Sequence, residues 1–122
     1  MTELVPRPNK RDEYLIYFAS KAAEKGWRDC LSQFRSATTD CYDQLTRDPL
    51  RQSYDQYQLS ADLSTALHEG VAYEQWQYKI SDGARVRYLV DKRPVLNARG
   101  KQTAMGRVII RAVDPGHPKD TQ

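Results

Sequence analysis

The sequence QYKISDGARVRY, residues 77–88, contains the clearest structural signal in the chain. It places two runs of β-favouring residues around a Ser-Asp-Gly turn, which predicts a tight antiparallel hairpin. If residues 81–83 form a three-residue loop with Gly83 in the left-handed conformation, Lys79 and Arg85 become cross-strand partners. A two-residue turn would shift the register by one residue and separate these two cations.

The three-residue loop also determines which side chains share a face of the sheet. Cross-strand partners point to the same side, so Lys79, Arg85 and Arg87 would project together. The opposite side of the hairpin carries apolar side chains that we expect to point toward helices: Tyr78, Val86, Tyr88 and Val90. Like charges side by side cost about a few tenths of a kcal/mol, so an anionic ligand would account for their placement. Solvated charge on an exposed sheet face is the alternative.

A strand and an amphipathic helical segment precede the hairpin. Residues 13–18 (EYLIYF) predict a short β-strand, and Ser20 is placed to cap the helix that follows. Across residues 27–45 the apolar side chains recur at the three-and-four spacing of one buried helical stripe. Hydroxyl and β-branched residues at 36–39 weaken this helix, so a single helix and a helical hairpin both remain open. Residues 48–49 (Asp-Pro) end the segment in either case.

Short strand patterns fill the rest of the chain. The expected elements are strands at 59–67, 73–80, 85–90 and 107–113, a turn at 68–70 and a long loop at 92–106. Helices followed by strands predict an α+β fold, with an antiparallel sheet of four to five strands and an N-terminal helix or helical hairpin packed on one face. The other face would be open to a ligand. Residues 1–12 are expected to form a flexible tail, and residues 13–122 a single domain.

Length and composition restrict the setting in which the protein works. The chain of 122 residues is long enough for one hydrophobic core. No apolar run approaches the about 18 residues that a membrane span requires, and the first residues lack the apolar segment of a signal peptide. We therefore expect a cytoplasmic protein that has no membrane partner.

Charge is divided unevenly along the chain. Residues 1–78 carry nine Lys/Arg against twelve Asp/Glu, a net charge of −3, whereas residues 79–122 carry ten against four, a net charge of +6. A concentrated basic face attracts polyanions, of which nucleic acid is the commonest. The plain alternative is that these charges only keep the chain in solution.

Cysteine and metal-ligand patterns give no sign of redox or metal chemistry. Cys30 and Cys41 are too few for a disulfide framework and are predicted to be small core residues rather than nucleophiles. No group of Cys, His, Asp and Glu has metal-ligand spacing, and no glycine-rich phosphate loop occurs. We therefore expect a mechanism that needs neither a metal nor a cofactor.

The two histidines differ in their surroundings. His117 lies in a GHPK tail directly after the last predicted strand, where it could exchange a proton near neutral pH. Lys119, beside it, could hold phosphate charge. His68 lies in a predicted turn, and no comparable functional residues are near it in the sequence.

Five pieces of the chain together match the order and spacing of a known family. They are KAAEKGW (21–27), LTRDP (45–49), QWQY (75–78), RVRY (85–88) and GHPK (116–119). Over roughly residues 13–121 the chain resembles the RelE/ParE superfamily of toxins from toxin–antitoxin systems, in particular its RelE-like branch common in actinobacteria and their phages. The resemblance implies an antiparallel sheet with a helical hairpin on one face and a nuclease-type site on the other.

The resemblance also implies a reaction and the residues that perform it. RelE-like toxins cut mRNA, usually in the ribosomal A site, by attack of a 2′-hydroxyl on the adjacent phosphate. Arg85 matches the strand arginine that stabilises charge at phosphorus, Lys79 would assist the 2′-hydroxyl or neutralise phosphate, and His117 matches the general acid for the leaving 5′-oxygen. The other cations expected to bind RNA are Arg87, Lys92, Arg93, Arg99, Lys101, Arg107, Arg111 and Lys119.

The chain departs from the family pattern in three places. Pro118 stands where the family's tail has an arginine, no tyrosine follows it, and the loop at 92–106 is longer than the usual hairpin. Lys119 is the candidate replacement for the missing arginine. The cations of the long loop are candidate contacts for ribosomal RNA or for an antitoxin.

A toxin of this family implies partners. They are a small cognate antitoxin that covers the basic face, mRNA, and the ribosome. One alternative is a ParE-like inhibitor of DNA gyrase, which shares the fold and needs no catalytic cluster. Another is a non-toxic, phage-borne binding module of the same fold, which would leave growth unaffected.

Overall fold

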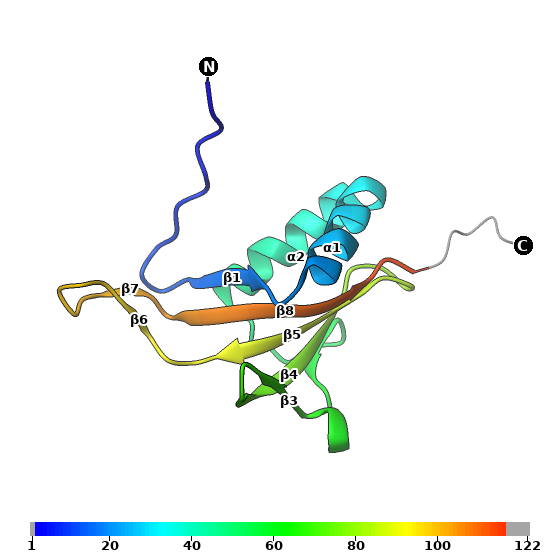
Figure 1. The fold of residues 1–122 in the computed structure, drawn as a ribbon. Coiled ribbons are helices and arrows are strands. Elements are labelled where there is room, and N and C mark those ends of the chain that lie inside the picture. Colours follow the sequence, from blue (N-terminus) through cyan, green and yellow to red (C-terminus); the bar gives the residue numbers. More distant parts are fainter. Residues whose placement is uncertain (1, 117–122) are drawn as a thin grey trace, which may run out of the picture.

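The computed structural model describes residues 2–116. Two helices cover one face of a sheet, and a small hairpin projects from one end (Figure 1). The helical elements are α1 (Lys21–Gln33), α2 (Arg35–Arg47) and a 3-10 turn, η1 (Ala61–Leu63). The strands are β1 (Tyr14–Phe18), β2 (Gln56–Gln58), β3 (Thr65–His68), β4 (Val71–Lys79), β5 (Arg85–Asp91), β6 (Val95–Leu96), β7 (Gln102–Ala104) and β8 (Gly106–Asp114). The expected α+β class is confirmed.

The main sheet is mostly antiparallel and contains one parallel pair. Its strand order is β1-β8-β5-β4-β2, and β3 also pairs with β4. β1 runs parallel to β8, with Tyr14 opposite Gly106 and Phe18 opposite Ile110. The parallel pair was not predicted, because nothing local in either strand sets the relative direction of two segments so far apart in sequence.

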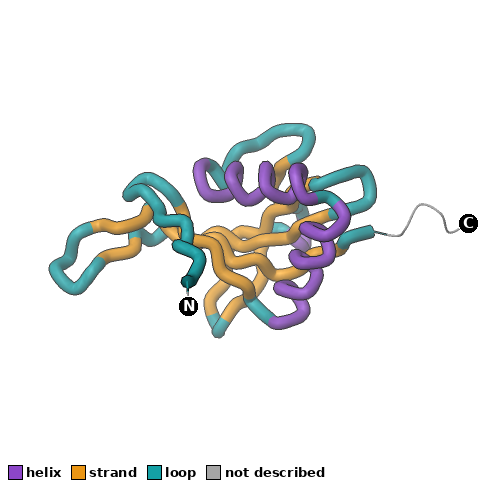
Figure 2. The backbone as a smooth tube through the Cα atoms, turned by 90° about the horizontal axis from the view of Figure 1, so that it is seen from above, coloured by secondary structure: helices purple, strands orange, loops and turns teal. Residues whose placement is uncertain are grey.

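The helical segment is a hairpin, one of the two possibilities that the sequence left open. Ser20 caps α1 as expected, since its Oγ accepts the N–H of Ala23 at 3.1 Å. The break lies at Phe34 instead of within residues 36–39, which belong to α2. Within α2 the Thr39 hydroxyl donates to a carbonyl one turn earlier, so it is satisfied without interrupting the helix. Figure 2 shows both helices over the same side of the strands.

The hydrophobic core lies between the helices and the sheet. Cys30 and Cys41 are both fully buried there and unpaired, and burial raises the pKa of the Cys41 thiol well above its usual range. Their predicted role as core residues is confirmed. Tyr88 is also buried: its hydroxyl donates to the Pro49 carbonyl at 2.7 Å and accepts from Gln56 Nε2 at 2.9 Å. These two bonds tie the end of α2 and the edge strand β2 to the middle of the sheet.

Two segments differ from their predictions. The strand expected at 59–67 is wrong over residues 59–64, which contain η1, and only its end belongs to a strand, β3, which begins at Thr65. β2, at Gln56–Gln58, precedes the expected range. The loop at 92–106 contains the short β6–β7 hairpin. Its turn is closed by Asn97, whose side-chain oxygen accepts the N–H groups of Arg99 and Lys101. A hairpin this short carries too little alternation to be read from sequence.

Residues 2–10 form neither helix nor strand. The end of this segment contacts β7, because Asn9 donates to the Thr103 carbonyl at 2.8 Å and Gln102 donates to the Arg11 carbonyl at 3.2 Å. The division into a flexible tail and one domain stays a prediction. Within residues 2–116, no helix is both long and apolar enough to cross a membrane.

The β3–β4 turn contains a strained residue that allows a test of stability. Glu69 has φ +50° and Gly70 has φ +82°, the combination that type I′ turns fill with Asn-Gly. Replacing Glu69 with Asn should stabilise the protein by about 0.5–1 kcal/mol, because Asn tolerates the left-handed region better. Urea unfolding of Glu69→Asn would measure the gain. Glu69→Gln keeps the backbone strain and removes only the charge, so it should leave the urea midpoint unchanged. If both variants gained the same stability, the charge of Glu69 and not its backbone conformation would be what destabilises the wild-type protein.

Candidate nucleic-acid interface

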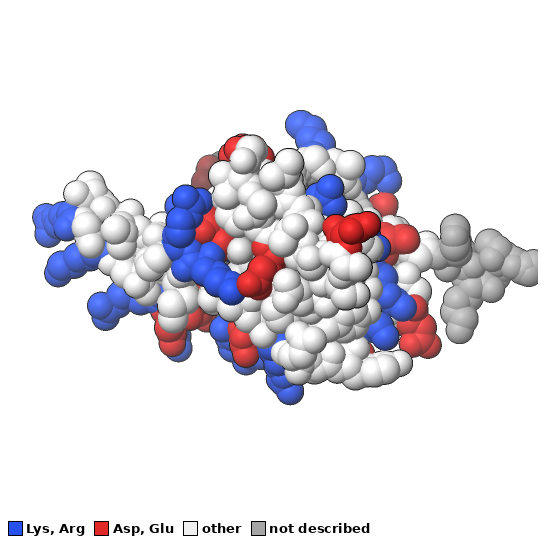
Figure 3. Space-filling view, turned by 90° about the horizontal axis from the view of Figure 1, so that it is seen from below, with Lys and Arg blue, Asp and Glu red and all other residues white. Residues whose placement is uncertain are grey.

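The face of the main sheet away from the helices, here called the open face, carries the candidate site. Side chains alternate along β5, so Arg85, Arg87 and Asp91 share the open face. Val86 and Tyr88 enter the core beneath the helices, as predicted. Figure 3 shows Lys and Arg side chains on the projecting hairpin and the adjoining part of this side of the molecule, with Asp and Glu among them.

The β4–β5 hairpin has the predicted register. Lys79 lies opposite Arg85, and Gln77 lies opposite Arg87. The connecting loop spans residues 81–83, as the three-residue alternative requires. Lys79, Arg85 and Arg87 therefore point to one side of the sheet.

The conformation expected of Gly83 is wrong, since it is not among the described glycines with positive φ. Ser81 closes the loop instead, because its Oγ accepts the N–H of Ala84 at 3.0 Å. Gly116 packs against the same loop: a Cβ placed on Gly116 would lie 3.0 Å from the carbonyl carbon and oxygen of Gly83. The described chain thus ends beside the loop that joins the two strands.

Lys79 and Arg85 border a hollow of about 370 Å³, here called the Lys79 hollow. Its lining residues are Tyr54, Asp55, Lys79, Ile80, Ser81, Asp82 and Arg85. The ammonium of Lys79 lies 4.1 Å from the centre of the Tyr54 ring and 5.8 Å from that of Tyr57. This cation–π contact orients the lysine without neutralising it.

Arg85 is anchored to the hairpin loop through one nitrogen. Its Nη1 donates to the carbonyls of Ser81, at 2.6 Å, and Ala84, at 3.3 Å. A guanidinium carries five N–H donors, so most of them remain for a ligand. The anchored group is half-buried and forms no ion pair with a carboxylate of the described residues.

Side-chain amides hold two further arginines on the open face. Arg87 Nε donates to Gln77 Oε1 at 3.3 Å, and Arg111 Nη1 donates to Gln75 Oε1 at 3.0 Å. Because β5 lies between β8 and β4, Arg111 reaches across it. Leu89 of β5 is fully buried although it points away from the helices, in line with the arginine covering it.

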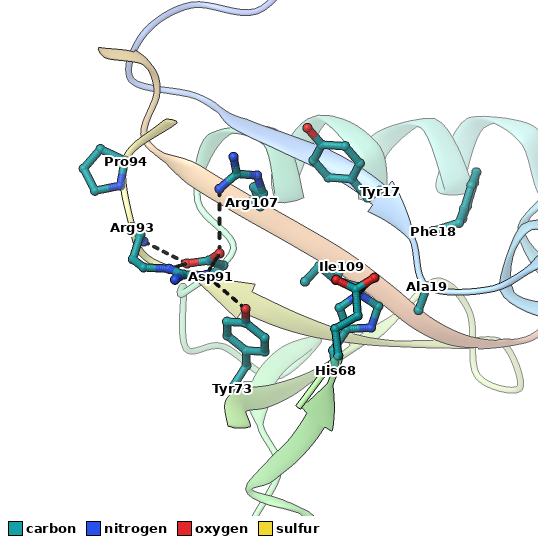
Figure 4. A pocket seen from close by; sticks show the side chains of 11 residues that line it. Tyr17, Phe18, Ala19, His68, Tyr73, Asp91, Arg93, Pro94, Arg107 and Ile109 are labelled. Atoms are coloured by element: carbon teal, nitrogen blue, oxygen red, sulfur yellow. Dashed lines mark hydrogen bonds and ion pairs between the residues drawn. The ribbon is translucent and has the colours of Figure 1, made fainter. Parts of the chain in front are cut away.

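A second and larger hollow, of about 720 Å³, lies at the other end of β5 and is here called the Asp91 hollow (Figure 4). Asp91 is 3% exposed and binds Arg93 twice, through Nε and Nη2, both at 2.9 Å. Arg107 Nη1 lies 3.8 Å from the same carboxylate, and Arg93 also donates to the Tyr73 hydroxyl at 3.2 Å. The hydrogen bonds from Arg93 hold the pKa of Asp91 below its usual range.

Sequence reasoning missed the Asp91 hollow. His68, for which the sequence indicated no neighbouring functional group, lines it together with Glu69, Tyr17 and Tyr73. The alternation of β5 beyond Leu89 was the available signal, since it places Asp91 on the same face as Arg85 and Arg87. The contributions of β1 and of the β3–β4 turn could not be foreseen without the sheet order.

The remaining predicted site residues are scattered. Lys92 forms an ion pair with Glu74 at 2.8 Å. Arg99 and Lys101 lie between β6 and β7, in the hairpin that projects from one end of the molecule (Figure 1). His117 and Lys119 lie outside the described residues. The structure therefore brings together Lys79, Arg85, Arg87 and Arg111, and separately Arg93 and Arg107.

The two hollows differ in their electrostatics. In the Asp91 hollow a carboxylate binds the arginines, whereas the cations around the Lys79 hollow are held by carbonyls, amides and aromatic rings. Asp55 and Asp82 line the Lys79 hollow but lie beyond ion-pair distance of its cations. The Lys79 end of the open face is the better place for a phosphate. No cluster of three or more metal-ligating side chains occurs among residues 2–116.

Comparison of the chain with protein-family models, with curated protein sequences and with solved structures gives no match. Membership of the RelE/ParE superfamily therefore stays a prediction from the sequence. The chemistry of the site rests on the geometry of its own residues.

The Asp91–Arg93 contact predicts a pH-dependent contribution to stability. A carboxylate whose pKa is lowered by folding stabilises the fold above its unfolded pKa, about 3.9, and loses that effect as the pH falls through the folded pKa. Asp91→Asn should lower the urea midpoint at pH 7, and its difference from wild type should shrink below about pH 4. Asp82→Asn, in the exposed β4–β5 loop, is the control and should match wild type. A difference that did not change with pH would mean that Asp91 contributes by packing alone.

Proposed function

We propose that this protein is a metal-independent endoribonuclease that cuts mRNA, a toxin of the RelE/ParE type. The observation that carries the proposal is the pairing of Lys79 and Arg85 as cross-strand neighbours at a hollow on the open face. Two cations without a carboxylate partner, on neighbouring strands, suit a phosphodiester.

The chemistry divides among three residues. The 2′-hydroxyl loses its proton to water as its oxygen attacks the adjacent phosphorus, and the bond from phosphorus to the 5′-oxygen breaks to leave a 2′,3′-cyclic phosphate. Negative charge grows on the phosphoryl oxygens in the transition state. Arg85, held in place by the loop carbonyls, would stabilise that charge with its remaining N–H donors. Lys79 would neutralise the phosphate or assist the 2′-hydroxyl. His117 is proposed as the acid that protonates the leaving 5′-oxygen.

Neighbouring side chains support RNA binding along the open face. Arg87 and Arg111 extend the positive charge from the Lys79 hollow toward the middle of the sheet. Few acid–base groups surround the scissile position, so we propose that the ribosome orients the mRNA. A cognate antitoxin would then inhibit the toxin in the cytoplasm by covering these cations.

One observation favours a second candidate. The bonds from Arg85 to the carbonyls of Ser81 and Ala84 would also serve a purely structural role, as in a binding protein that shares the fold. A ParE-like inhibitor of DNA gyrase needs no more than that. A non-toxic binding module of the same fold is the remaining alternative.

Induction of the chain alone in a bacterial host separates these functions. We expect growth arrest with new mRNA 5′ ends, and loss of both in Arg85→Gln and Lys79→Gln, because removing one donor to the developing charge costs about 10²–10³ in rate. His117→Ala tests the proposed acid. Arg35→Gln and Lys21→Gln make the same changes of charge at exposed positions on the helices and should remain toxic.

Each other outcome would replace the proposal. Arrest with intact transcripts, retained in the Arg85 and Lys79 variants, would support the gyrase-type inhibitor. If growth were not arrested at all, the non-toxic binding module would be the supported function.

A further inference from the structure

The Asp91 hollow lies on the same face as the proposed cleavage site, at the far end of the same strand. Arg85 and Asp91 share one side of β5 and are six residues apart, about 20 Å at roughly 3.4 Å per residue. In the middle of this path Arg111 crosses β5 above the buried Leu89 to reach Gln75, and Arg87 lies beside it. A single strand of RNA that placed a phosphate at Arg85 would reach the hollow within a few nucleotides.

The charges in the Asp91 hollow argue against a second phosphate site. Arg93 and Arg107 both contact the buried Asp91 carboxylate, and Glu69 adds a further negative charge to the lining. Two guanidiniums and two carboxylates cancel, so a net negative group gains little there. A ligand that is neutral overall and carries both donors and acceptors would use both kinds of side chain.

The shape of the hollow fits a flat ring. Tyr17 of β1 and Tyr73 of β4 lie on opposite sides of it, and Ile109 lies between them (Figure 4). Two phenol rings and an aliphatic floor offer surfaces on which a nucleobase can stack. The volume, about 720 Å³, is in the range of small-molecule sites.

Backbone strain at the rim is an independent observation. Glu69 occupies a left-handed position that Asn or Gly would fill at lower cost; it is one of the residues that line the hollow, and its Oε2 lies 3.9 Å from Nε2 of His68. Strained residues concentrate at functional sites, and the Glu69 carboxylate is largely exposed and therefore accessible to a ligand in the hollow. Asp91 is a positioning residue in this arrangement, because its carboxylate binds Arg93 twice and lies 3.8 Å from Nη1 of Arg107.

We propose that the Asp91 hollow is a base-recognition site for guanine in the RNA whose phosphate lies at Arg85; the inference rests on the proposed function. Guanine alone among the four bases has two adjacent acceptors, O6 and N7, for a guanidinium fork and two adjacent donors, N1–H and N2–H, for a carboxylate fork. Arg107 supplies the first contact and Glu69 the second.

Binding of short RNAs tests the proposal on the full chain. The probes are uncleavable 2′-O-methyl oligonucleotides of about eight residues, a length within the usual range for single-strand sites, measured by fluorescence anisotropy. We expect a uridine oligomer with one guanosine to bind about tenfold more tightly than the same oligomer with one adenosine or none. Equal affinities for the three would overturn the proposal.

Variants place the preference in the hollow. In Arg107→Gln and in Glu69→Gln, whose amide offers one acceptor where the carboxylate offers two, the guanosine-to-adenosine affinity ratio should fall to about one. Arg35→Gln, on the helical side, should keep the wild-type ratio. A guanosine preference that survived in Arg107→Gln and Glu69→Gln would assign the recognition elsewhere and overturn the proposal.

The same titrations keep the two proposals apart. Lys79→Gln and Arg85→Gln should weaken all three oligonucleotides equally, because they remove phosphate contacts and leave the base site intact. If wild type bound all three oligonucleotides equally and these two variants lost that binding, the guanine site would be wrong and the proposed function would still be supported. If wild type bound none of the oligonucleotides, the guanine site would fall, whereas the proposed function would be decided by the growth arrest and mRNA 5′ ends described above.

Discussion

The alternation of side chains along β5 is the constraint on which both the core and the site depend. Val86, Tyr88 and Val90 fill the space under the helices. The residues that alternate with them along β5 are Arg85, Arg87, Leu89 and Asp91, and their side chains point to the open face. A slip of one residue would place Arg85 or Asp91 in the core, where an unpaired charge costs several kcal/mol, on the order of the whole stability of a small domain. The packing of the helices thus fixes the register, and the register places the cations of the open face.

At the Lys79 end of the open face, the cationic side chains are held in place by groups that do not neutralise them. Gln75 and Gln77 accept hydrogen bonds from Arg111 and Arg87, and a ring of Tyr54 faces Lys79. Amides and aromatic rings orient a cation while leaving its charge available, which a carboxylate would not do. At the other end Asp91 uses a carboxylate for the same purpose, so one strand presents a positive region and a region of balanced charge.

The sequence was sufficient for features that depend on local chemistry. The start of α1 followed from Ser20 and the end of α2 from Asp48 and Pro49, whereas the Lys79–Arg85 register was one of two that the sequence allowed, and the left-handed Gly83 expected with it is absent. Features that depend on distant contacts were out of reach. The parallel β1–β8 pair and the joining of His68 to the Asp91 hollow need the sheet order, and the break at Phe34 reflects how two helices of similar propensity pack.

The position of β8 has a consequence for the synthesis of the protein. It is the last strand of the described chain, and it lies between β1 and β5. Until it has been made, β1 has no partner in the sheet, and α1 lacks the surface at Val113 against which Gly26 packs closely. N-terminal segments normally fold first during translation, but here the first strand must wait for the last. A growing chain therefore cannot join β1 and α1 to the rest of the sheet until β8 has emerged from the ribosome.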